Sequence, residues 1–597
     1  MHYLKTIFIL FILFFNYCKA QDSTNSIIDY ISPEVFTSDD DVNIFLENLI
    51  DNPIDINKAE VKDLLHLPFM SFENTKLILA FRDSLGGFNQ LSELYAIPDI
   101  QKNIIYRILP YIKISDEQSL NHSGKMDYTG KIYKRNNLNK FNLNDNRVLN
   151  KFTLTNSNED IKAGLTFEKD PGEKNFNDYS SFYLEVNNFL SFDNIILGDY
   201  DIEFGEGLVN WSYSNYFRTS DGFSYYNKSN LKPHKYMNEN LFYRGLSALT
   251  TTKYFDFIFF FSNNKIDAEL DSNNNIKKFS SSTNNNNVSE TAFGSIIKYQ
   301  PNENFFLSFL FNSSIFDKPD IFNRKIFPSF SFYYNLSLND INLSGEVAND
   351  KIRTAFVNTL KYFLNSALLY KVQLNYIPHL FTSFHRRYFN RYDLDGLNLS
   401  NNLIYFTTFG EIIVGTDFMS RIKSEEEIPD GSNFNINYIS KIFYKLSYRM
   451  KYYINIDNYT TTGERYRKQV FSNELNYFLD YSTKLKSRLE YYTSAKDNKN
   501  INGYILFNQI DYRINNNLNL CFNFSFFNQN DERLYGNVID NDLTGNYQAV
   551  SYEGTGSRWY ISTSYNFFDN YRLLFYYSQI RKKNNDNYLN MILNVEI

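Results

Sequence analysis

The sequence predicts a mainly β protein, a large transmembrane antiparallel β-barrel of roughly 18–22 strands preceded by a small N-terminal all-α domain. The first observation is composition: the mean hydropathy is -0.43, yet 18% of the residues are aromatic, including 49 Tyr and 57 Phe. The second is that, after its start, the chain has no apolar run of about 20 residues, which a membrane-spanning helix needs. The third is that its later segments alternate apolar and polar residues, as barrel strands with one lipid face and one wet face do.

Residues 1–20 have the features of a secretory signal peptide. Lys5 supplies a basic start, residues 7–15 are an unbroken apolar run, and Ala20 offers a small residue at a cleavage site. We therefore predict export across the inner membrane. Residues 21–53 are acidic and polar, and we expect a linker or a small helical cap there.

Residues 54–114 have helical spacing instead of alternation. Asn57 and Glu60 form a start that is similar to a capping box. Helix breaks or stops follow at Pro68, Gly86-Gly87, Pro98 and Pro110. This pattern predicts two helix-break-helix units of about 30 residues each, packed as one tandem helix-hairpin-helix domain.

The motif order of this region resembles a tandem helix-hairpin-helix domain of the ComEA competence-protein type. The similar segments are Ile54–Ala59, Leu64–Pro68, Phe81-Arg82, Gly87-Phe88, Glu93-Leu94 and Ile97-Pro98. In that family each hairpin reads Pro-Gly-Ile-Gly, and the resemblance implies that exposed backbone amides contact a DNA phosphate. The corresponding hairpins here are Pro68, Phe69, Met70, Ser71 and Pro98, Asp99, Ile100, Gln101. Both glycines are therefore absent from each hairpin, and Asp99 adds a negative charge.

The charge of the helical region also disfavours DNA binding. Residues 54–114 contain seven basic and seven acidic side chains, whereas phosphate binding depends on a basic excess. The net charge of -7 for the whole chain argues against a general nucleic-acid binder. We expect this domain to contact another envelope protein, with DNA contact as the alternative.

Residues 125–597 are predicted to form the barrel. The clearest alternating segments are 161–168, 368–376, 445–457 and 518–526. Residues 588–597 are apolar at every second position, so we expect them to close the barrel onto its first strand. The Asn- and Ser-rich stretch 271–289 is expected to be an exposed loop. A large secreted β-sandwich or propeller is the alternative to the membrane barrel.

Residues 198–211 are the most unusual part of the predicted barrel. Asp199, Asp201 and Glu203 share one strand face, and three acids can bind a hard cation such as calcium. We prefer the interpretation of a polar lumen face that ends at a bend near Gly205. The stretch resembles a Gly-Asp-Tyr…Phe-Gly-x-Gly-Leu-Val…Trp segment of little-characterised bacterial proteins that join a helix-hairpin-helix domain to an outer-membrane barrel. That resemblance implies an architecture and a location.

Signals for an enzyme are absent from the sequence. Its six histidines have no metal-ligand spacing, and it has neither a Gly-x-Ser-x-Gly elbow nor a phosphate-binding loop. We predict no enzymatic activity, no cofactor and no metal. Cys521 is left alone once Cys18 is removed with the leader, so no intramolecular disulfide is expected. His385 and Arg386 belong to a basic and aromatic patch that we interpret as a strand rim.

These observations lead to two hypotheses. The preferred one is a non-enzymatic outer-membrane barrel that contacts lipid, with its helical domain in the periplasm, serving envelope transport or assembly. The alternative is a DNA-uptake component whose helix-hairpin-helix domain receives DNA in the periplasm.

Overall fold

The computed structural model describes part of the helical region and most of the strand region. The described residues are 53–59, 64, 72–98, 100, 105, 108–114, 125–137, 146–156, 160–169, 179–211, 231–235 and 242–596, the last range with gaps at 280–286, 303, 339, 366, 379–380, 387–395, 408–409, 421–429, 444–445, 459–464, 481, 497–498, 516, 530–535, 542–546, 553, 568–570 and 583–587. The predicted signal peptide, almost all of the predicted linker and the first hairpin lie outside the described residues, as do Asp99 and Gln101.

The strand region forms one closed antiparallel barrel, which confirms the predicted fold class. Its first strands are β3 (Lys125–Asn137), β4 (Asn146–Thr155), β5 (Ile161–Lys169), β6 (Tyr179–Phe189), β7 (Phe192–Ile202), β8 (Leu231–Pro233), β9 (Tyr243–Thr251), β10 (Phe255–Ile266), β13 (Val288–Asn302), β14 (Phe305–Phe316), β15 (Ile326–Leu338) and β16 (Ile341–Asn349). The remaining strands are β17 (Thr354–Asn365), β18 (Leu368–Ile377), β19 (Gly396–Thr407), β20 (Gly410–Ser420), β21 (Asp430–Phe443), β22 (Leu446–Asn458), β23 (Arg465–Phe478), β24 (Thr483–Lys496), β25 (Lys499–Arg513), β26 (Leu518–Gln529), β29 (Gly554–Phe567), β30 (Tyr571–Lys582) and β31 (Tyr588–Glu596).

The ring contains more strands than the sequence predicted. Among the described residues, twenty-four strands surround the barrel and the short β8 pairs with the end of β7, whereas the prediction was roughly 18–22. The predicted spacing assumed longer connections than the chain has. Several neighbouring strands are joined by two-residue hairpins, such as β6–β7, β15–β16 and β17–β18, and these leave room for extra strands.

The predicted closing strand is confirmed. β31 pairs antiparallel with β30 on one side and with β3 on the other. The register places Leu593 opposite Phe575 of β30 and opposite Ile132 of β3. The last strand therefore joins the two ends of the sheet, which leaves this sheet without an unpaired edge.

The connections between strands alternate in length. Short turns follow β6, β9, β13, β15, β17, β19, β21, β23, β25 and β29, whereas the long connections follow β3, β5, β7, β10, β14, β18, β20 and β26. The connections after β4, β22 and β30 are intermediate in length, and those after β16 and β24 are short. In an up-and-down barrel, successive connections lie at opposite ends, so most of the long connections gather at one end. The hairpin of β11 (Ala268–Leu270) and β12 (Ile276–Phe279) belongs to that long-connection end. The stretch 271–289 was predicted to be an exposed loop, and Ser272, Asn273 and Asn274 are exposed. The prediction is wrong for β12, where Ile276 packs into a small buried cluster.

The two faces of the barrel wall differ in exposure along each strand. On β10, Phe259 and Phe261 are 55% and 51% exposed, whereas Ile258 and Phe260 are 2% and 4% exposed. Other exposed large apolar side chains are Phe182, Leu197, Leu246, Phe293, Ile297, Phe309, Phe330, Phe332, Leu397, Phe418, Phe471, Leu489, Phe522 and Ile561. The outer face therefore carries apolar and aromatic groups around the ring, as a lipid-facing surface does.

The helical domain has its own core and its own closure. It contains α4 (Phe72–Leu85) and the 3₁₀ helices η2 (Leu91–Ala96) and η3 (Leu109–Tyr111). Its two short strands, β1 (Ile54–Asp55) and β2 (Ile112–Lys113), pair in parallel and bring the ends of the domain together. Its buried core comprises Ile56, Ala59, Leu64, Ile78, Phe88, Leu94, Ile97, Ile100, Ile105, Ile108, Ile112 and Ile114. None of the helices among the described residues is long and apolar enough to cross a membrane.

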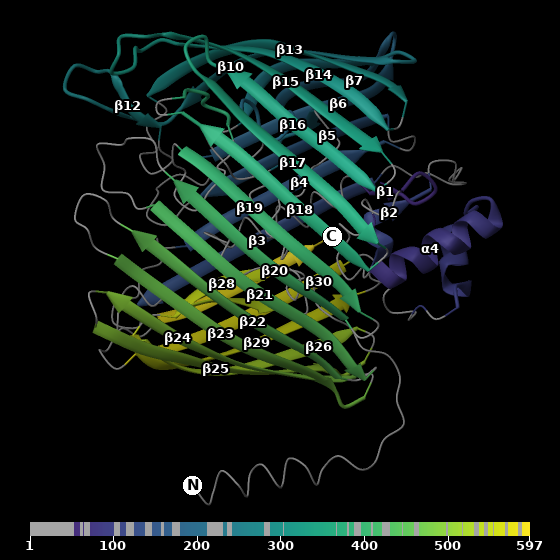
Figure 1. The fold of residues 1–597 in the computed structure, drawn as a ribbon, viewed down its shortest axis with the longest axis vertical. Helices are drawn as coiled ribbons and strands as arrows, with labels where there is room; N and C mark the ends of the chain where they lie inside the picture. The colour runs from purple at the N-terminus through teal and green to yellow at the C-terminus, as the bar shows by residue number, and fades with distance from the viewer. Residues whose placement is uncertain are drawn as a thin grey trace, which may run out of the picture.

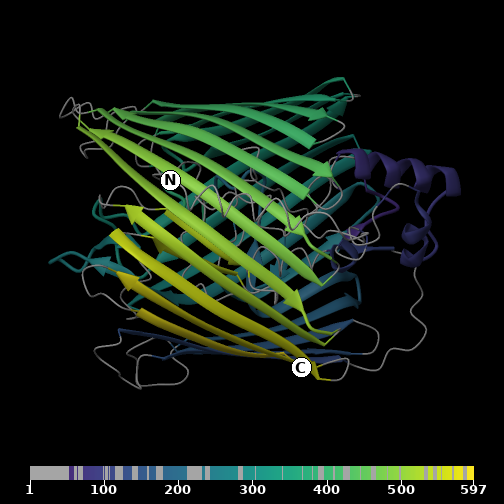
Figure 2. The same ribbon diagram turned by 90° about the horizontal axis from the view of Figure 1, so that it is seen from below.

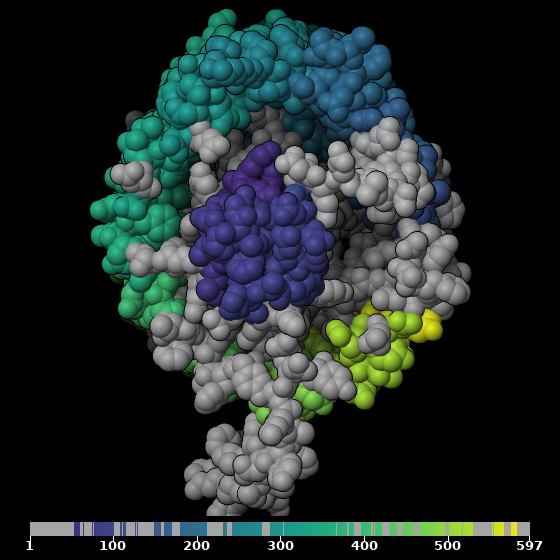
Figure 3. Space-filling view, turned by 90° about the vertical axis from the view of Figure 1, so that its right-hand side faces the viewer, coloured from purple at the N-terminus to yellow at the C-terminus, as the bar shows by residue number. Residues whose placement is uncertain are grey.

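The helical domain lies at one end of the barrel. Figures 1 and 2 place α4 beyond the ends of the strands, and Figure 1 has β12 at the other end. Figure 3 looks at the α4 end, with the helical domain in front of the ring of strands. Because β3 follows the domain and leads into a long connection, the domain is attached at the short-turn end.

Candidate functional site

The candidate site is a segment that leaves the barrel wall after β7 and packs against one side of the inner wall. β7 pairs with β6 only as far as Gly198, and Tyr200–Ile202 then pairs with β8 instead. Gly198 has a φ of +97°, and a Cβ there would lie 2.2 Å from the carbonyl oxygen of Phe182. This position therefore requires glycine, and the change of partner starts at it.

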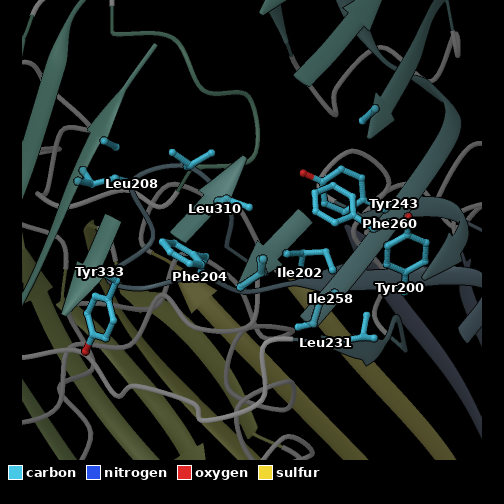
Figure 4. Packing of buried hydrophobic residues seen from close by; sticks show 14 of the residues in the cluster. Tyr200, Ile202, Phe204, Leu208, Leu231, Tyr243, Ile258, Phe260, Leu310 and Tyr333 are labelled. Atoms are coloured by element: carbon cyan, nitrogen blue, oxygen red, sulfur yellow. The ribbon is translucent and has the colours of Figure 1, made fainter. Parts of the chain in front are cut away.

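Residues 203–211, which we call the luminal segment, pack against the inner face of the barrel. Phe204, Leu208 and Val209 are at most 1% exposed. They share one cluster with inward side chains of seven wall strands: Ile258, Phe260, Ala292, Ile296, Leu310, Tyr333, Ala348, Ala355, Val357 and Ile377. Figure 4 shows Phe204 and Leu208 near Leu310 and Tyr333 within this cluster. The lumen on this side therefore contains a packed apolar core.

A single carboxylate holds the turn of the luminal segment. Glu346, which is fully buried on the inner face of β16, accepts hydrogen bonds from the backbone amides of Glu206 at 2.6 Å and Leu208 at 3.2 Å. The hydroxyl of Ser331 donates to its other oxygen at 2.6 Å. Gly205 has a φ of +53°, and a Cβ there would lie 2.7 Å from Glu346 Oε2. The predicted glycine bend is thus a bend around a carboxylate.

A second long connection supports the luminal segment from the other side. The Ser383 hydroxyl donates to the carbonyl of Val209 at 2.7 Å, and the Trp211 amide donates to the carbonyl of His385 at 2.8 Å. His385 Nε2 lies 3.1 Å from Glu290 on β13, and the His385 ring stacks on Tyr243 at 4.2 Å. His385 is therefore buried in a turn that contacts the luminal segment, and it does not lie in the rim strand that was predicted for its patch.

Each of the three predicted acids is buried and contacts one basic side chain. Asp199 pairs with Arg244 at 2.6 Å, Asp201 with His234 at 2.9 Å, and Glu203 with Lys232 at 2.6 Å. All three acids are at most 2% exposed, and they alternate along the chain with Tyr200, Ile202 and Phe204, which join the luminal cluster. Each carboxylate thus has a basic partner of its own, which joins β7 to β8 and β9.

No group of three or more His, Cys, Asp or Glu side chains in the described part of the chain is arranged to hold a metal ion. Because Arg244, His234 and Lys232 already face the three acids, the geometry favours the interpretation without a cation.

The predicted hairpins of the helical domain are described only in part. Pro98 is exposed, and Ile100 is 7% exposed and packs in the domain core. Pro68, Phe69, Met70, Ser71, Asp99 and Gln101 lie outside the described residues. One basic side chain of the domain is engaged inside it, because Arg82 Nη1 donates to the carbonyl of Ala59 at 2.6 Å. Lys58 Nζ lies 3.4 Å from Asp55 at the surface, where its side chain is 76% exposed. The donor Nη1 of Arg82 is therefore directed into the domain and away from a phosphate at its surface.

Sequence reasoning missed Glu346 and Glu290, which hold the luminal segment and its support. One signal for Glu346 was present, because it is the only charged residue in β16 and it lies between small and apolar neighbours. A lone acid in such a strand needs a partner, since burying a carboxylate without hydrogen bonds is costly. Its partners, however, come from a distant part of the chain.

Comparisons with known proteins identify the helical domain and give distant likenesses for the barrel. A family model described as "Helix-hairpin-helix motif" matches residues 51–113. No curated protein matches the chain.

Among solved structures, the siderophore receptor PirA from Acinetobacter baumannii aligns with a TM-score of 0.41 and 8% identity, over 80% of this chain and 81% of that one. OccK5 (OpdH) from Pseudomonas aeruginosa aligns at 0.30 and 9% identity, over 52% of this chain and 92% of that one. The E. coli P pilus tip assembly intermediate PapC-PapD-PapK-PapG aligns at 0.41 and 10% identity, over 82% of this chain and 63% of that one.

Proposed function

We propose that this protein is a non-enzymatic outer-membrane β-barrel that serves transport across the envelope, with its helix-hairpin-helix domain in the periplasm. The observation that carries the proposal is the combination of an apolar outer face with short and long connections at opposite ends of one closed barrel. In outer-membrane barrels the short turns face the periplasm and the longer loops face outward. The helical domain is attached at the short-turn end.

The width of the lumen and the segment folded into it support a role in transport more than a purely structural role. The twenty-four strands that the described residues form around the ring make a barrel wide enough to enclose a channel or a plugged lumen. Here the luminal segment and the connection at 381–386 pack against one side of the inner wall. A segment folded into the lumen from the long-connection end narrows any path through the barrel, as a constriction in a channel does.

The orientation is testable with two epitope insertions in described, exposed turns. We expect an epitope after Asn273, in the β11–β12 turn, to react with antibody on intact cells. An epitope after Lys253, in the β9–β10 turn, should react only after the outer membrane is permeabilised. Both proteins should fractionate with the outer membrane and change gel mobility on heating. The reverse labelling pattern, or recovery as soluble protein, would contradict the proposal.

For the helical domain we propose contact with another envelope protein. Its charge is balanced, Arg82 is used inside the domain, and neither hairpin carries the glycines of the DNA-binding pattern. The family match at residues 51–113 is the observation that favours DNA contact instead. Titration of the isolated domain with duplex DNA distinguishes contact with DNA from contact with a protein.

We expect the isolated fragment 51–116 to bind duplex DNA only weakly, with a Kd no tighter than about 10⁻⁴ to 10⁻⁶ M at physiological salt. The matched variant restores the family pattern with Phe69→Gly, Ser71→Gly, Asp99→Gly and Gln101→Gly. It should bind more tightly and with a steeper salt dependence, because it frees backbone amides and removes one negative charge. Titrations at two salt concentrations measure both. Tight, salt-sensitive binding by the unmodified fragment would make DNA contact the leading role.

A further inference from the structure

The hydrogen-bonded ladder of the barrel wall is interrupted between β6 and β7. The two strands pair only as far as Tyr183 and Gly198, and the next residues of β7 pair with β8 instead. Elsewhere the wall is continuous: β10, for example, pairs with β13 along its whole length. We call the contact between residues 179–182 of β6 and residues 199–202 of β7 the seam, because these two stretches are neighbours without a ladder.

The side chains of one ion pair bridge the seam. Asp199 accepts a hydrogen bond from the amide of Phe182 at 3.1 Å, and Arg244 of β9 donates through Nη2 to the carbonyl of Ser180 at 2.9 Å. Arg244 also donates to both carboxylate oxygens of Asp199, at 2.6 and 2.9 Å. Two side chains therefore satisfy backbone groups of β6 that a ladder satisfies elsewhere. We call Asp199 and Arg244 the latch.

The latch can separate while the neighbouring strands stay paired. The Arg244 side chain is 43% exposed, so water can take over its hydrogen bonds, and ion pairs that are open to water contribute little to stability. β6 keeps its ladder with β5, and β9 keeps its ladder with β10. Opening of the seam is therefore a local event, of the kind that occurs where few backbone contacts must break.

Apolar side chains lie on both sides of the seam. On the outer face, Phe182 and Leu246 are 47% and 46% exposed. On the inner face, Tyr183, Ile202 and Leu231 belong to the same buried cluster as the luminal segment. Figure 4 shows Ile202 and Leu231 within this cluster. The apolar outer wall and the apolar core of the lumen therefore meet at the seam.

The seam is closed in this structure, and its latch is joined to the luminal segment. Tyr183 and Tyr200, which lie behind the seam, are 3% and 0% exposed. Asp199 belongs to the last part of β7, which leads directly into the luminal segment. Separation of the latch therefore frees that stretch from β6. β7 runs toward the long-connection end, so the seam lies in the half of the wall that the proposed orientation places nearer the outer leaflet.

We infer that the seam is a lateral passage between the lumen and the outer leaflet for amphiphiles with an apolar chain, such as fatty acids. This inference rests on the proposed transport function and names its substrate class. Transfer of an apolar chain into water is unfavourable in proportion to the area exposed. The seam offers such a chain a route from lipid to the apolar core of the lumen without that exposure, once Asp199 and Arg244 separate.

The test is photolabelling of the purified full-length protein in phosphatidylcholine vesicles that contain a palmitate analogue with a diazirine in its chain. Labelled peptides are identified by mass spectrometry. In the wild type we expect label on the outer face, at Phe259 and Phe261, and also on the luminal segment, at Phe204 and Leu208. The ratio of luminal to outer-face label then measures passage through the wall.

Arg244→Gln and Asp199→Asn should each raise this ratio by about threefold or more, because each removes a charge from the latch. The matched control is Arg324→Gln. Arg324 lies 2.7 Å from Asp320 in the turn between β14 and β15, so the change removes a similar ion pair outside the seam. It should leave the ratio unchanged.

A covalent link across the seam should give the opposite result. Phe182→Cys with Asp199→Cys places two thiols at the positions that follow the last register pair, Tyr183 and Gly198. Without a linker, the loss of Asp199 should raise luminal labelling. A short bismaleimide between the two thiols should lower it below the wild-type level and leave outer-face labelling unchanged. Cys521 is buried and does not compete for the reagent.

Heat-modified gel mobility shows whether each variant is folded, and ion current in planar bilayers measures transport independently. No luminal label in the wild type and in both latch variants would overturn the lateral passage, as would a ratio that neither the latch variants nor the linker changes. A retained current would then leave the transport function intact. The absence of both current and luminal label in every folded variant would overturn the transport function as well.

Discussion

Phe261→Arg is expected to block assembly of the barrel in membranes. Phe261 is 51% exposed on the outer face of β10, and its register partners Leu246 and Phe293 are also exposed and apolar. An arginine on the lipid face near the bilayer midplane costs about 2–4 kcal/mol. We therefore expect much less heat-modifiable protein in the outer-membrane fraction, measured by gel mobility after fractionation.

The control for this substitution is Phe261→Leu, which keeps an apolar side chain at the same position and should assemble normally. A water-exposed outer face would give the opposite order, because an exposed arginine is then harmless and increases solubility. Equal assembly of the two variants would therefore contradict a lipid-facing wall at β10.

Glu346→Ala is expected to loosen the luminal segment and increase the current through the barrel. The change removes the acceptor for the amides of Glu206 and Leu208, and each buried amide left without an acceptor costs about 1–3 kcal/mol. The wall strand β16 keeps its backbone pairing, so the lost stability affects the luminal segment and not the barrel wall. Single-channel conductance in planar bilayers and the Tm of the detergent-solubilised protein measure the two effects.

Glu269→Ala is the matched control, because Glu269 is an exposed acid whose partner, Lys277, lies in the same hairpin. It should change neither conductance nor Tm. Glu346→Gln should be intermediate, since the amide oxygen still accepts hydrogen bonds but without a negative charge. A Glu346→Ala protein with wild-type conductance and Tm would mean that the carboxylate does not hold the segment.

The strands could be predicted well because their signal is local. In β18 and β26 the alternation of side chains along a few residues records which face meets lipid and which meets the lumen. The signal that ends α4 is also local, because it lies in the two glycines that follow the helix. Gly86 and Gly87 have positive φ angles, and the Gly87 amide donates to the carbonyl of Arg82 at 3.0 Å. The number of strands was less accurate, because it depends on the length of every turn.

The roles of the predicted site residues were harder to predict. Asp199, Asp201 and Glu203 were visible as a row of acids, but their partners Arg244, His234 and Lys232 follow 29 to 45 residues later. Without those partners, three acids on one face resemble a cation site. In the structure the same three acids are buried, and each contacts a basic side chain of a later segment.

By itself the sequence determined the closed alternating wall and the separate helical domain, since periodicity, caps and apolar content are properties of neighbouring residues. Only the tertiary structure decided what fills the lumen. Glu346 accepts a hydrogen bond from the amide of Glu206, 140 residues away in the chain, and the hydroxyl of Ser383 donates to the carbonyl of Val209, 174 residues away. Contacts of this kind depend on how the ring closes and which strands become neighbours. Closure brings inward side chains from distant strands into one enclosed space. A buried charge there is costly unless it has a partner, so these partners determine how the luminal segment packs.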